Sequence, residues 1–298
     1  MKIVQSFWSK PLFSSSYLSN TLQLYNGWPH RVLNYYSWAL SCSELNTYYG
    51  NVELVTDDLG KELLIDRLKL PYTSVNTALN DLAGFNRKLM FLGKLYACGL
   101  QTAPFLHIDG DIFISQKLDE STVNAPLVAQ NYEIANARVF LGLFERLGEI
   151  PDYYKTMYEN PIAKSANSGI IGGSDISFFR DFVKEGFAFL ERNMDRVEDA
   201  MALDYIGFNL CYEQLLFSQF AAYRDRSISF FLPEIEDYYH PETGVGYFHA
   251  AEENKGFIHC LAGYKRFAVT HANVEHRLKT KYPEQYHRIN DLLNLCEI

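Results

Sequence analysis

The chain has 298 residues, of which 48% are hydrophobic and 21% are charged. These values are ordinary for a globular protein and exclude a disordered chain, a collagen and a coiled coil. The net charge of −9 disfavours general nucleic-acid binding, because that activity needs clustered cations. The first residues lack a basic flank before a long apolar run, and no stretch reaches the ~20 apolar residues that cross a bilayer. We therefore expect no signal peptide and no transmembrane segment, although peripheral membrane contact stays open.

The cysteines indicate a reducing compartment. There are five of them, an odd number, and none forms a CxxC pair. A disulfide framework or a zinc site is therefore not expected, and the cytoplasm is the expected location.

In the first half of the chain, predicted strands alternate with predicted helices. Strands are expected at 2–7, 51–56, 72–75 and 105–108. Helices are expected at 31–48, from Asp57 or Asp58 to about Leu70, and at 86–99. This alternation of strands and helices indicates βαβ units, and therefore an α/β fold with a mostly parallel sheet.

The second half is less regular. Strands are expected at 126–130, 169–173 and 227–232, and helices at 133–147, 178–193 and 203–220. Residues 259–266 are expected in a loop or at a strand end, and the last thirty residues in helices interrupted at Pro283. Because there is no internal repeat and no Pro-rich linker, we expect one continuous architecture.

The strongest local motif is Asp109-Gly110-Asp111, which directly follows an apolar strand. In open α/β sheets, ligands bind at the carboxyl ends of strands. Two neighbouring carboxylates repel each other, so a divalent cation with oxygen ligands is expected between them. The alternative is a plain surface turn, since Asp and Gly both favour turns.

Three further motifs carry polar side chains that suit a ligand site. Asn167 stands next to Ser168-Gly169, and its amide can both donate to and accept from sugar hydroxyls. Glu213-Gln214 interrupts an apolar helical pattern, so these residues face either a cleft or the solvent. His259 can complete a metal site, and Lys265 six residues later can reach a phosphate. The alternatives are a turn into a buried strand for the first motif and a structural histidine for the last.

In this order, the four motifs resemble those of the GT-A nucleotide-sugar glycosyltransferases, and among them the retaining enzymes of glycosyltransferase families 8 and 32. The resemblance spans the chain from the first strand to about Lys265 and is greater to bacterial enzymes of polysaccharide or lipopolysaccharide assembly than to glycogenin. It implies a Rossmann-like GT-A fold with a mixed, mostly parallel central sheet flanked by helices. It also implies one catalytic domain over 1–298, with a nucleotide-binding half (1–125), a donor-sugar and acceptor half (126–270) and a C-terminal helical tail (271–298).

The resemblance also implies roles for individual residues. Asp109, Asp111 and His259 would bind Mn²⁺ or Mg²⁺, and Lys265 and Gly263 would contact the donor diphosphate. Asn167 and Gly169 would contact the transferred sugar or the acceptor. Glu213 and Gln214 would lie beside the donor sugar as catalytic residues. Arg87, Lys88 or Lys94 would contact the donor from the preceding helix, and Lys94 is favoured by its distance from Asp109. Asp57 would line the nucleotide pocket at the ends of the first two strands.

The sequence departs from the family pattern at three places. Leu215 stands where the family's Asp-Gln-Asp motif has its second acid. Gly263 is displaced by one position, although His259 and Lys265 keep their separation. Arg266 and Phe267 replace a proline and a tryptophan. These departures indicate a divergent family of the same fold.

The function implied is a metal-dependent, retaining hexosyltransferase that uses a UDP-sugar donor and a glycan or glycolipid acceptor. One alternative is a nucleotidyltransferase of related fold, but residues 6–11 lack the glycines of a triphosphate-binding loop. Another is a sugar- or nucleotide-binding protein that has lost activity. The sequence leaves the acceptor and the donor sugar open.

Overall fold

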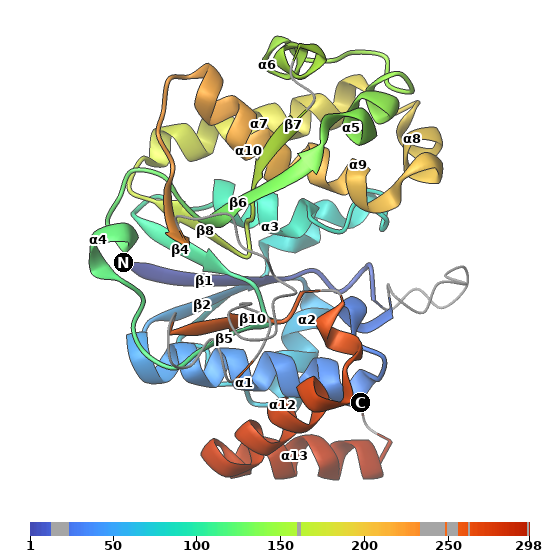
Figure 1. Cartoon of the computed structure of the whole chain (residues 1–298). Helices are drawn as coiled ribbons and strands as arrows, with labels where there is room; N and C mark the ends of the chain where they lie inside the picture. Colours follow the sequence, from blue (N-terminus) through green and yellow to red (C-terminus); the bar gives the residue numbers. More distant parts are fainter. Residues whose placement is uncertain (13–23, 160–161, 233–247, 249–255, 262, 297) are drawn as a thin grey trace. The chain divides into compact units, whose positions relative to one another are not determined.

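The computed structural model describes residues 1–12, 24–159, 162–232, 248, 256–261, 263–296 and 298 (Figure 1). The chain divides into two compact units. Unit 1 comprises Met1, Leu89–His107 and Asp119–Glu236, and unit 2 comprises Lys2–Lys88, Ile108–Leu118 and Asp237–Ile298. Within the described residues, no helix is long and apolar enough to span a membrane.

Unit 2 contains three parallel strands in the order β3-β2-β1, and its strand β10 pairs antiparallel with β5. Its helices and strands, in chain order, are β1 (Lys2–Phe7), the 3-10 turn Leu24–Gly27, α1 (Arg31–Tyr49), β2 (Val52–Thr56), α2 (Asp58–Lys61), the π-helical turn Glu62–Arg67, β3 (Ser74–Asn76), the 3-10 helix Ala78–Gly84, β5 (Ile112–Ile114), β10 (Phe257–His259), the 3-10 turn Tyr264–Arg266, α12 (Ala268–Lys281) and α13 (Pro283–Asn294).

Helix α1 is the centre of unit 2. Every residue from Leu33 to Leu45 is buried, so this helix has no solvent-facing stripe over three turns. It contacts β2 and β5, and it also packs against α12 and α13 (Figure 1). Trp38 of α1 meets Phe7 of β1 edge-to-face, with ring centroids 5.1 Å apart.

Unit 1 contains a sheet in the order β4-β8-β6-β7, with β9 parallel to β6. Strand β6 is antiparallel to both β7 and β8. The elements are α3 (Leu92–Gly99), β4 (Phe105–Ile108), α4 (Glu120–Val123), β6 (Val128–Asn136), α5 (Ala137–Phe144), α6 (Asp152–Lys155), the 3-10 turn Thr156–Tyr158, β7 (Ile162–Ala166), β8 (Ile170–Gly173), α7 (Ile176–Arg192), α8 (Val197–Leu203), α9 (Tyr205–Cys211), α10 (Gln214–Tyr223) and β9 (Ser229–Leu232).

Aromatic side chains hold helices α7 and α10 of unit 1 together. Phe179 and Phe182 of α7 lie 5.8 Å and 5.4 Å from Phe217 of α10, measured between ring centroids. Asp175 caps the start of α7 by accepting a hydrogen bond from the Phe178 backbone N–H. Both units thus contain strands as well as helices. The predicted α/β class, with a mixed sheet and flanking helices, is confirmed.

Three helices predicted from the sequence are shorter or broken in the structure. The helix predicted at 86–99 begins only at Leu92, because Asn209 and Tyr212 side chains take the backbone N–H groups of residues 90 and 91. The first four residues of the helix predicted at 133–147 belong to β6, where they pair with β7. The helix predicted at 203–220 is two helices, separated at Tyr212 and Glu213.

Other differences are smaller. The predicted third strand is shifted to Ser74–Asn76, and the helix that Asp57 caps turns π-helical at Glu62. Strands β5, β7 and β10 and helices α4, α6 and α8 are additional to those predicted. Four of the five cysteines are buried and Cys296 is exposed, and all five are free.

A buried ion pair links α1 to α12. The Arg277 guanidinium donates to a Glu44 carboxylate oxygen at 2.6 Å, and Lys281 lies 3.7 Å from the same oxygen. Glu44 is only 1% exposed. Burial outweighs the two cations and raises the pKa of Glu44 from its usual 4.5 to about 7.

The raised pKa of Glu44 predicts a pH-dependent contribution to stability. The folded state keeps the proton at pH values where the unfolded state has lost it. The contribution of Glu44 to the free energy of unfolding therefore decreases as pH rises from about 4.5 to about 7. We expect the difference in unfolding free energy between the wild type and Glu44→Gln to fall by up to roughly 3 kcal/mol over this range. Urea denaturation at several pH values measures it, and a difference that does not change with pH would contradict it.

Candidate functional site

The first group of site residues lies in unit 2, around the turn that leads into β5. Asp109 follows the last residue of β4, and Asp111 precedes the first residue of β5. His259 ends β10 and pairs with Ile112 of β5, and the Cys260 N–H donates to the Asp111 carbonyl at 3.0 Å. One ligand atom each from Asp109, Asp111 and His259 lies within 4.8 Å of the other two. The structure thus brings together the three residues that the sequence analysis groups as metal ligands.

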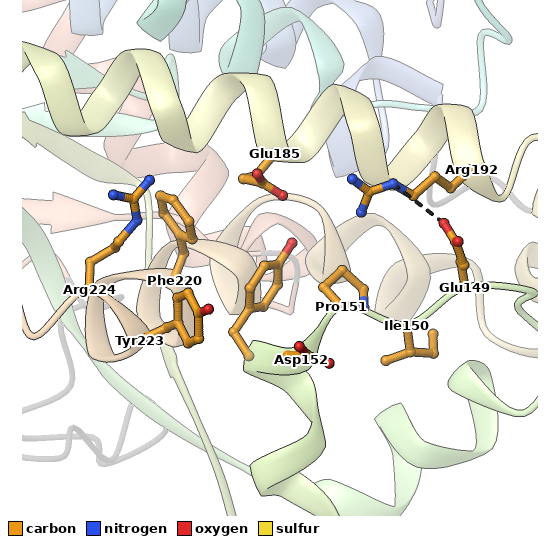
Figure 2. Close-up of a pocket in the computed structure, with 10 residues that line it drawn as sticks. Glu149, Ile150, Pro151, Asp152, Glu185, Arg192, Phe220, Tyr223 and Arg224 are labelled. Carbon is orange, nitrogen blue, oxygen red and sulfur yellow. Dashed lines mark ion pairs between the residues drawn. The ribbon is translucent and has the colours of Figure 1, made fainter.

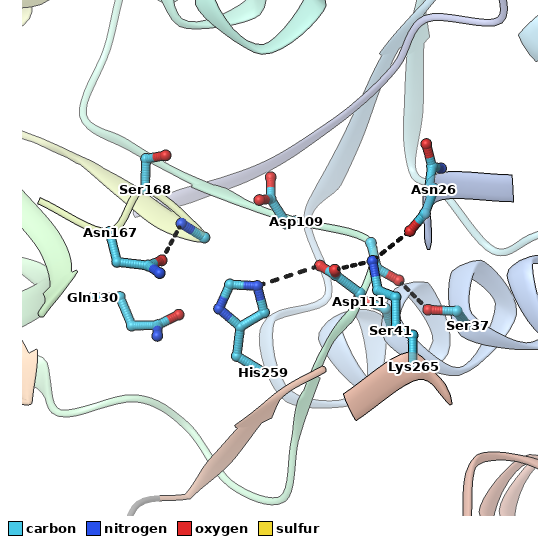
Figure 3. A network of polar contacts seen from close by, with 12 residues as sticks. Asn26, Ser37, Ser41, Asp109, Asp111, Gln130, Asn167, Ser168, His259 and Lys265 are labelled. Atoms are coloured by element: carbon cyan, nitrogen blue, oxygen red, sulfur yellow. Dashed lines mark hydrogen bonds and ion pairs between the residues drawn. The ribbon is translucent and has the colours of Figure 1, made fainter. Parts of the chain in front are cut away.

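The glycine between the two acids is packed against α1. A Cβ atom at Gly110 would lie 2.7 Å from the Trp38 ring, which is too close for any side chain without movement of the indole. The Ser37 hydroxyl donates to the Gly110 carbonyl at 2.7 Å (Figure 3). The buried Gln5 amide also donates to the Asp109 carbonyl at 3.4 Å. These contacts fix the backbone that carries both carboxylates.

Lys265 belongs to the same group. Its ammonium lies 2.7 Å from Asp111 Oδ2 and donates to the Asn26 carbonyl at 2.6 Å, while His259 Nε2 lies 3.6 Å from Asp111 Oδ1 (Figure 3). The two oxygens of Asp111 therefore have different neighbours. Asn26 is in a left-handed conformation with φ of 55°, which costs energy for a non-glycine residue.

The chemistry of this donor set fits a divalent cation. Two carboxylates offer the hard oxygen atoms that Mg²⁺ and Mn²⁺ prefer, and an imidazole nitrogen suits Mn²⁺ and other transition metals. Lys265 lies beside Asp111. A divalent cation between the carboxylates of Asp109 and Asp111 would offset their mutual repulsion.

A second group of site residues lies in unit 1, where Lys94 of α3 meets Glu213. The Lys94 ammonium is 3.0 Å from Glu213 Oε1 and donates to the Ser168 carbonyl at 3.1 Å. The Ser168 hydroxyl also donates to Glu213 Oε1. Glu213 is 1% exposed, so it does not lie on an exposed helix face. It precedes the first residue of α10 and is not part of a continuous helix with α9. Its Oε2 atom has no hydrogen-bond partner among the residues that the structure describes.

Glu133 ties two further predicted residues into this region of unit 1. Its carboxylate accepts from the Asn167 amide at 2.7 Å and from the Gln214 amide at 2.6 Å. Asn167 Oδ1 in turn accepts from the Gly169 N–H at 2.9 Å (Figure 3). Lys94, Asn167, Gly169, Glu213 and Gln214 are therefore joined by hydrogen bonds and chain adjacency into one group.

His107 of β4 is buried in unit 1 and lies within the influence of Lys94. Burial and, after it, the positive charge of Lys94 hold the pKa of His107 well below its usual value. The imidazole is therefore neutral near pH 7 and adds no charge beside the Lys94–Glu213 pair.

The remaining predicted residues have local contacts. Asp57 caps α2 through the Gly60 N–H at 2.8 Å and accepts from both the backbone N–H and the hydroxyl of Ser9. The Lys88 backbone donates to the Asn86 side chain, and Gly263 precedes the 3-10 turn that contains Lys265. The nucleotide-binding roles of these residues stay predictions.

Two residues of the unit 1 group were missed by the sequence analysis. Ser168 lies between Asn167 and Gly169, so its place in this motif could have marked it as a site residue, but no role is predicted for it. Glu133 was assigned to a helix, and its partners are 34 and 81 residues away in the chain. No local pattern predicts such contacts.

The unit 2 group predicts that the protein binds Mn²⁺ without any nucleotide. Replacing Asp109 by Asn removes a charged ligand and leaves the Asp111–Lys265 pair intact. We expect this change, and His259→Ala, to weaken Mn²⁺ binding at least about tenfold. Isothermal titration calorimetry measures the affinity, and circular dichroism checks the fold.

The matched control for the metal experiment is Asp66→Asn. Asp66 is an exposed carboxylate of unit 2, paired with Lys61. The Asp66→Asn variant should bind Mn²⁺ with the affinity of the wild type. Equal loss of affinity in the control, or none in Asp109→Asn, would exclude the turn as the metal site.

The buried pair in unit 1 predicts a large effect on stability. Lys94→Met leaves the Glu213 carboxylate buried without its cation, so we expect the free energy of unfolding to fall by about 3–5 kcal/mol. The double variant Lys94→Met/Glu213→Leu removes both charges and should recover most of that loss. Urea denaturation of the three proteins measures these values. A Lys94→Met variant as stable as the wild type would contradict a buried ion pair between Lys94 and Glu213.

Comparisons with known proteins give one family and two similar structures. No curated protein matches the chain in sequence. The chain is similar to the glycosyltransferase GlyE of Streptococcus pneumoniae TIGR4 (TM-score 0.44, 11% identity, 99% of this chain and 64% of that one). It is also similar to the galactosyltransferase LgtC, solved with donor and acceptor sugar analogues (TM-score 0.34, 12% identity, 66% of each chain). The chain thus spans just under two thirds of either protein. Residues 1–292 match the family of unknown function DUF6734, and the chain belongs to that family.

Proposed function

We propose that this protein is a metal-dependent glycosyltransferase that moves a hexose from a UDP-sugar to a glycan or glycolipid acceptor with retention of configuration. The observation that carries the proposal is the group formed by Asp109, Asp111, His259 and Lys265 in unit 2. It combines ligands for a divalent cation with an ammonium group. A divalent cation and an ammonium group can both bind the negatively charged oxygens of a donor diphosphate.

The first requirement of glycosyl transfer is to offset the negative charge that develops on the leaving diphosphate. Asp109, Asp111 and His259 would hold a divalent cation, which would supply a Lewis acid for that charge. Lys265 adds a positive charge next to Asp111 Oδ2. Its contact with the fixed Asn26 carbonyl keeps the ammonium in place before the substrate binds.

The second requirement is to hold the donor sugar while its ring gains oxocarbenium character. Asn167 and Gln214 are held in place by Glu133, which favours a role in binding sugar hydroxyls. Glu213 is paired with Lys94 and accepts a hydrogen bond from Ser168, so its Oε1 atom is already occupied by two protein groups. This supports a role in positioning and in local electrostatics more than one as a covalent nucleophile. Attack by the acceptor on the same face as the leaving group is therefore the mechanism that we propose.

The proposal predicts Mn²⁺-dependent release of UDP from a UDP-sugar. We expect the wild type to release UDP slowly from UDP-glucose or UDP-galactose, with water in place of the acceptor. Asp109→Asn should lower the rate by about 100-fold or more, because the charge stabilisation that it supports acts in the transition state. A coupled assay for UDP measures the rate, with Asp66→Asn as the control.

A thermal-shift experiment with nucleotides and UDP-sugars, read together with the UDP assay, distinguishes the alternatives. Thermal stabilisation by Mn²⁺ with GTP or CTP, and none with UDP, would favour a nucleotidyltransferase. Stabilisation by UDP-sugars with no UDP release under any metal would favour a binding protein without transfer activity. Either result would overturn the proposal.

A further inference from the structure

Unit 1 contains a cavity that none of the predicted site residues lines. It is largely open to solvent, has a volume of about 740 Å³ and lies between residues 149–153, helix α7 and the C-terminal end of α10 (Figure 2). Its volume falls within the range of small-molecule pockets. Tyr223 at the cavity is nine residues from Gln214 along α10, which corresponds to about 14 Å of helix. The cavity is therefore separate from the group around Lys94 and Glu213.

One side of the cavity is aromatic. The Tyr153 ring meets Phe220 and Tyr223 edge-on, with centroid distances of 5.8 Å and 6.1 Å. Tyr223 is 62% exposed, whereas Phe220 is buried beneath the Arg224 guanidinium, 5.0 Å from its ring. An exposed tyrosine ring offers a flat apolar face and a hydroxyl at its edge, and the apolar face of a sugar ring can stack on such a surface.

Charged groups of both signs also line the cavity, and one of them, Arg224, lies beside the aromatic rings. Glu149, Asp152 and Glu185 supply carboxylates, and Arg192 and Arg224 supply guanidinium groups (Figure 2). Arg192 is paired with Glu149 at 3.4 Å, and Arg224 is paired with Asp181 at 3.0 Å. Because positive and negative groups lie close together, the cavity favours neither an anion nor a cation.

The cavity therefore suits a neutral ligand that both donates and accepts hydrogen bonds. Carboxylates only accept and guanidinium groups only donate, so a ligand that satisfies both needs groups of dual character. Sugar hydroxyls have that character, and sugar rings also carry apolar C–H faces. We propose that this cavity is a saccharide-binding site that holds a neutral oligosaccharide, with Tyr223 as its stacking platform. The proposal does not depend on transfer activity or on a nucleotide.

Calorimetric titration with maltotriose, cellotriose and N-acetylchitotriose, in the absence of metal and nucleotide, tests the proposal. We expect saturable binding of at least one of these probes. Tyr223→Ala should weaken that binding about tenfold, which is the loss of one aromatic contact. Tyr158→Ala is the matched control, because Tyr158 is 57% exposed in the same unit and does not line the cavity.

Three results would overturn the proposal. The first is that none of the three probes binds. The second is that Tyr223→Ala binds the saccharide as tightly as the wild type. The third is that citrate or arginine methyl ester binds more tightly than the saccharides. The metal-site variant Asp109→Asn should bind the saccharide like the wild type. This outcome separates the cavity from the proposed transferase site, so that either proposal can fail without the other.

Discussion

The short antiparallel pairing of β10 with β5 is the constraint on which the unit 2 site depends. Only three residue pairs form it, yet they set the position of His259 beside Asp111. The turn that carries the acids cannot adjust independently, because Gly110 is in contact with Trp38 and its carbonyl is bonded to Ser37. Helix α1 therefore acts as a rigid support for residues far from it in sequence. A site built on such supports needs little reorganisation to bind a cation.

Three of the acids described above are accompanied by long basic side chains. Lys265 accompanies the half-buried Asp111, Lys94 accompanies Glu213, and Arg277 and Lys281 accompany Glu44. A buried carboxylate is costly unless it is paired, so these contacts explain how acids persist inside both units. The pairs differ in their surroundings. Asp111 keeps a second oxygen toward His259, whereas the second oxygens of Glu44 and Glu213 have no hydrogen-bond partner among the described residues. This difference fits Asp111 to a ligand-binding role.

The sequence predicts the elements that local pattern controls. Strands β1, β2 and β4 and helices α1 and α7 are formed by apolar runs and by periodic spacing, and they lie where expected. Prediction fails at residues 90–91 and 133–136, because side chains and strands distant in sequence take their backbone hydrogen bonds. The same distinction holds for the site. Asp109 and Asp111 are recognisable because they are neighbours, whereas Glu133 is joined to its partners only by the fold.

The position of Glu133 determines the hydrogen-bonding polarity of the unit 1 group. Its carboxylate accepts from the amino groups of both Asn167 and Gln214. Those two amides therefore have fixed orientations, since a flipped amide would bring two oxygens together. The Asn167 side-chain oxygen already accepts from the Gly169 N–H, whereas no hydrogen bond to the Gln214 side-chain oxygen is formed among the residues that the structure describes. If Gln214 binds a sugar as we propose, that sugar would donate a hydroxyl to this oxygen, and Glu133 would impose this direction without contacting the ligand.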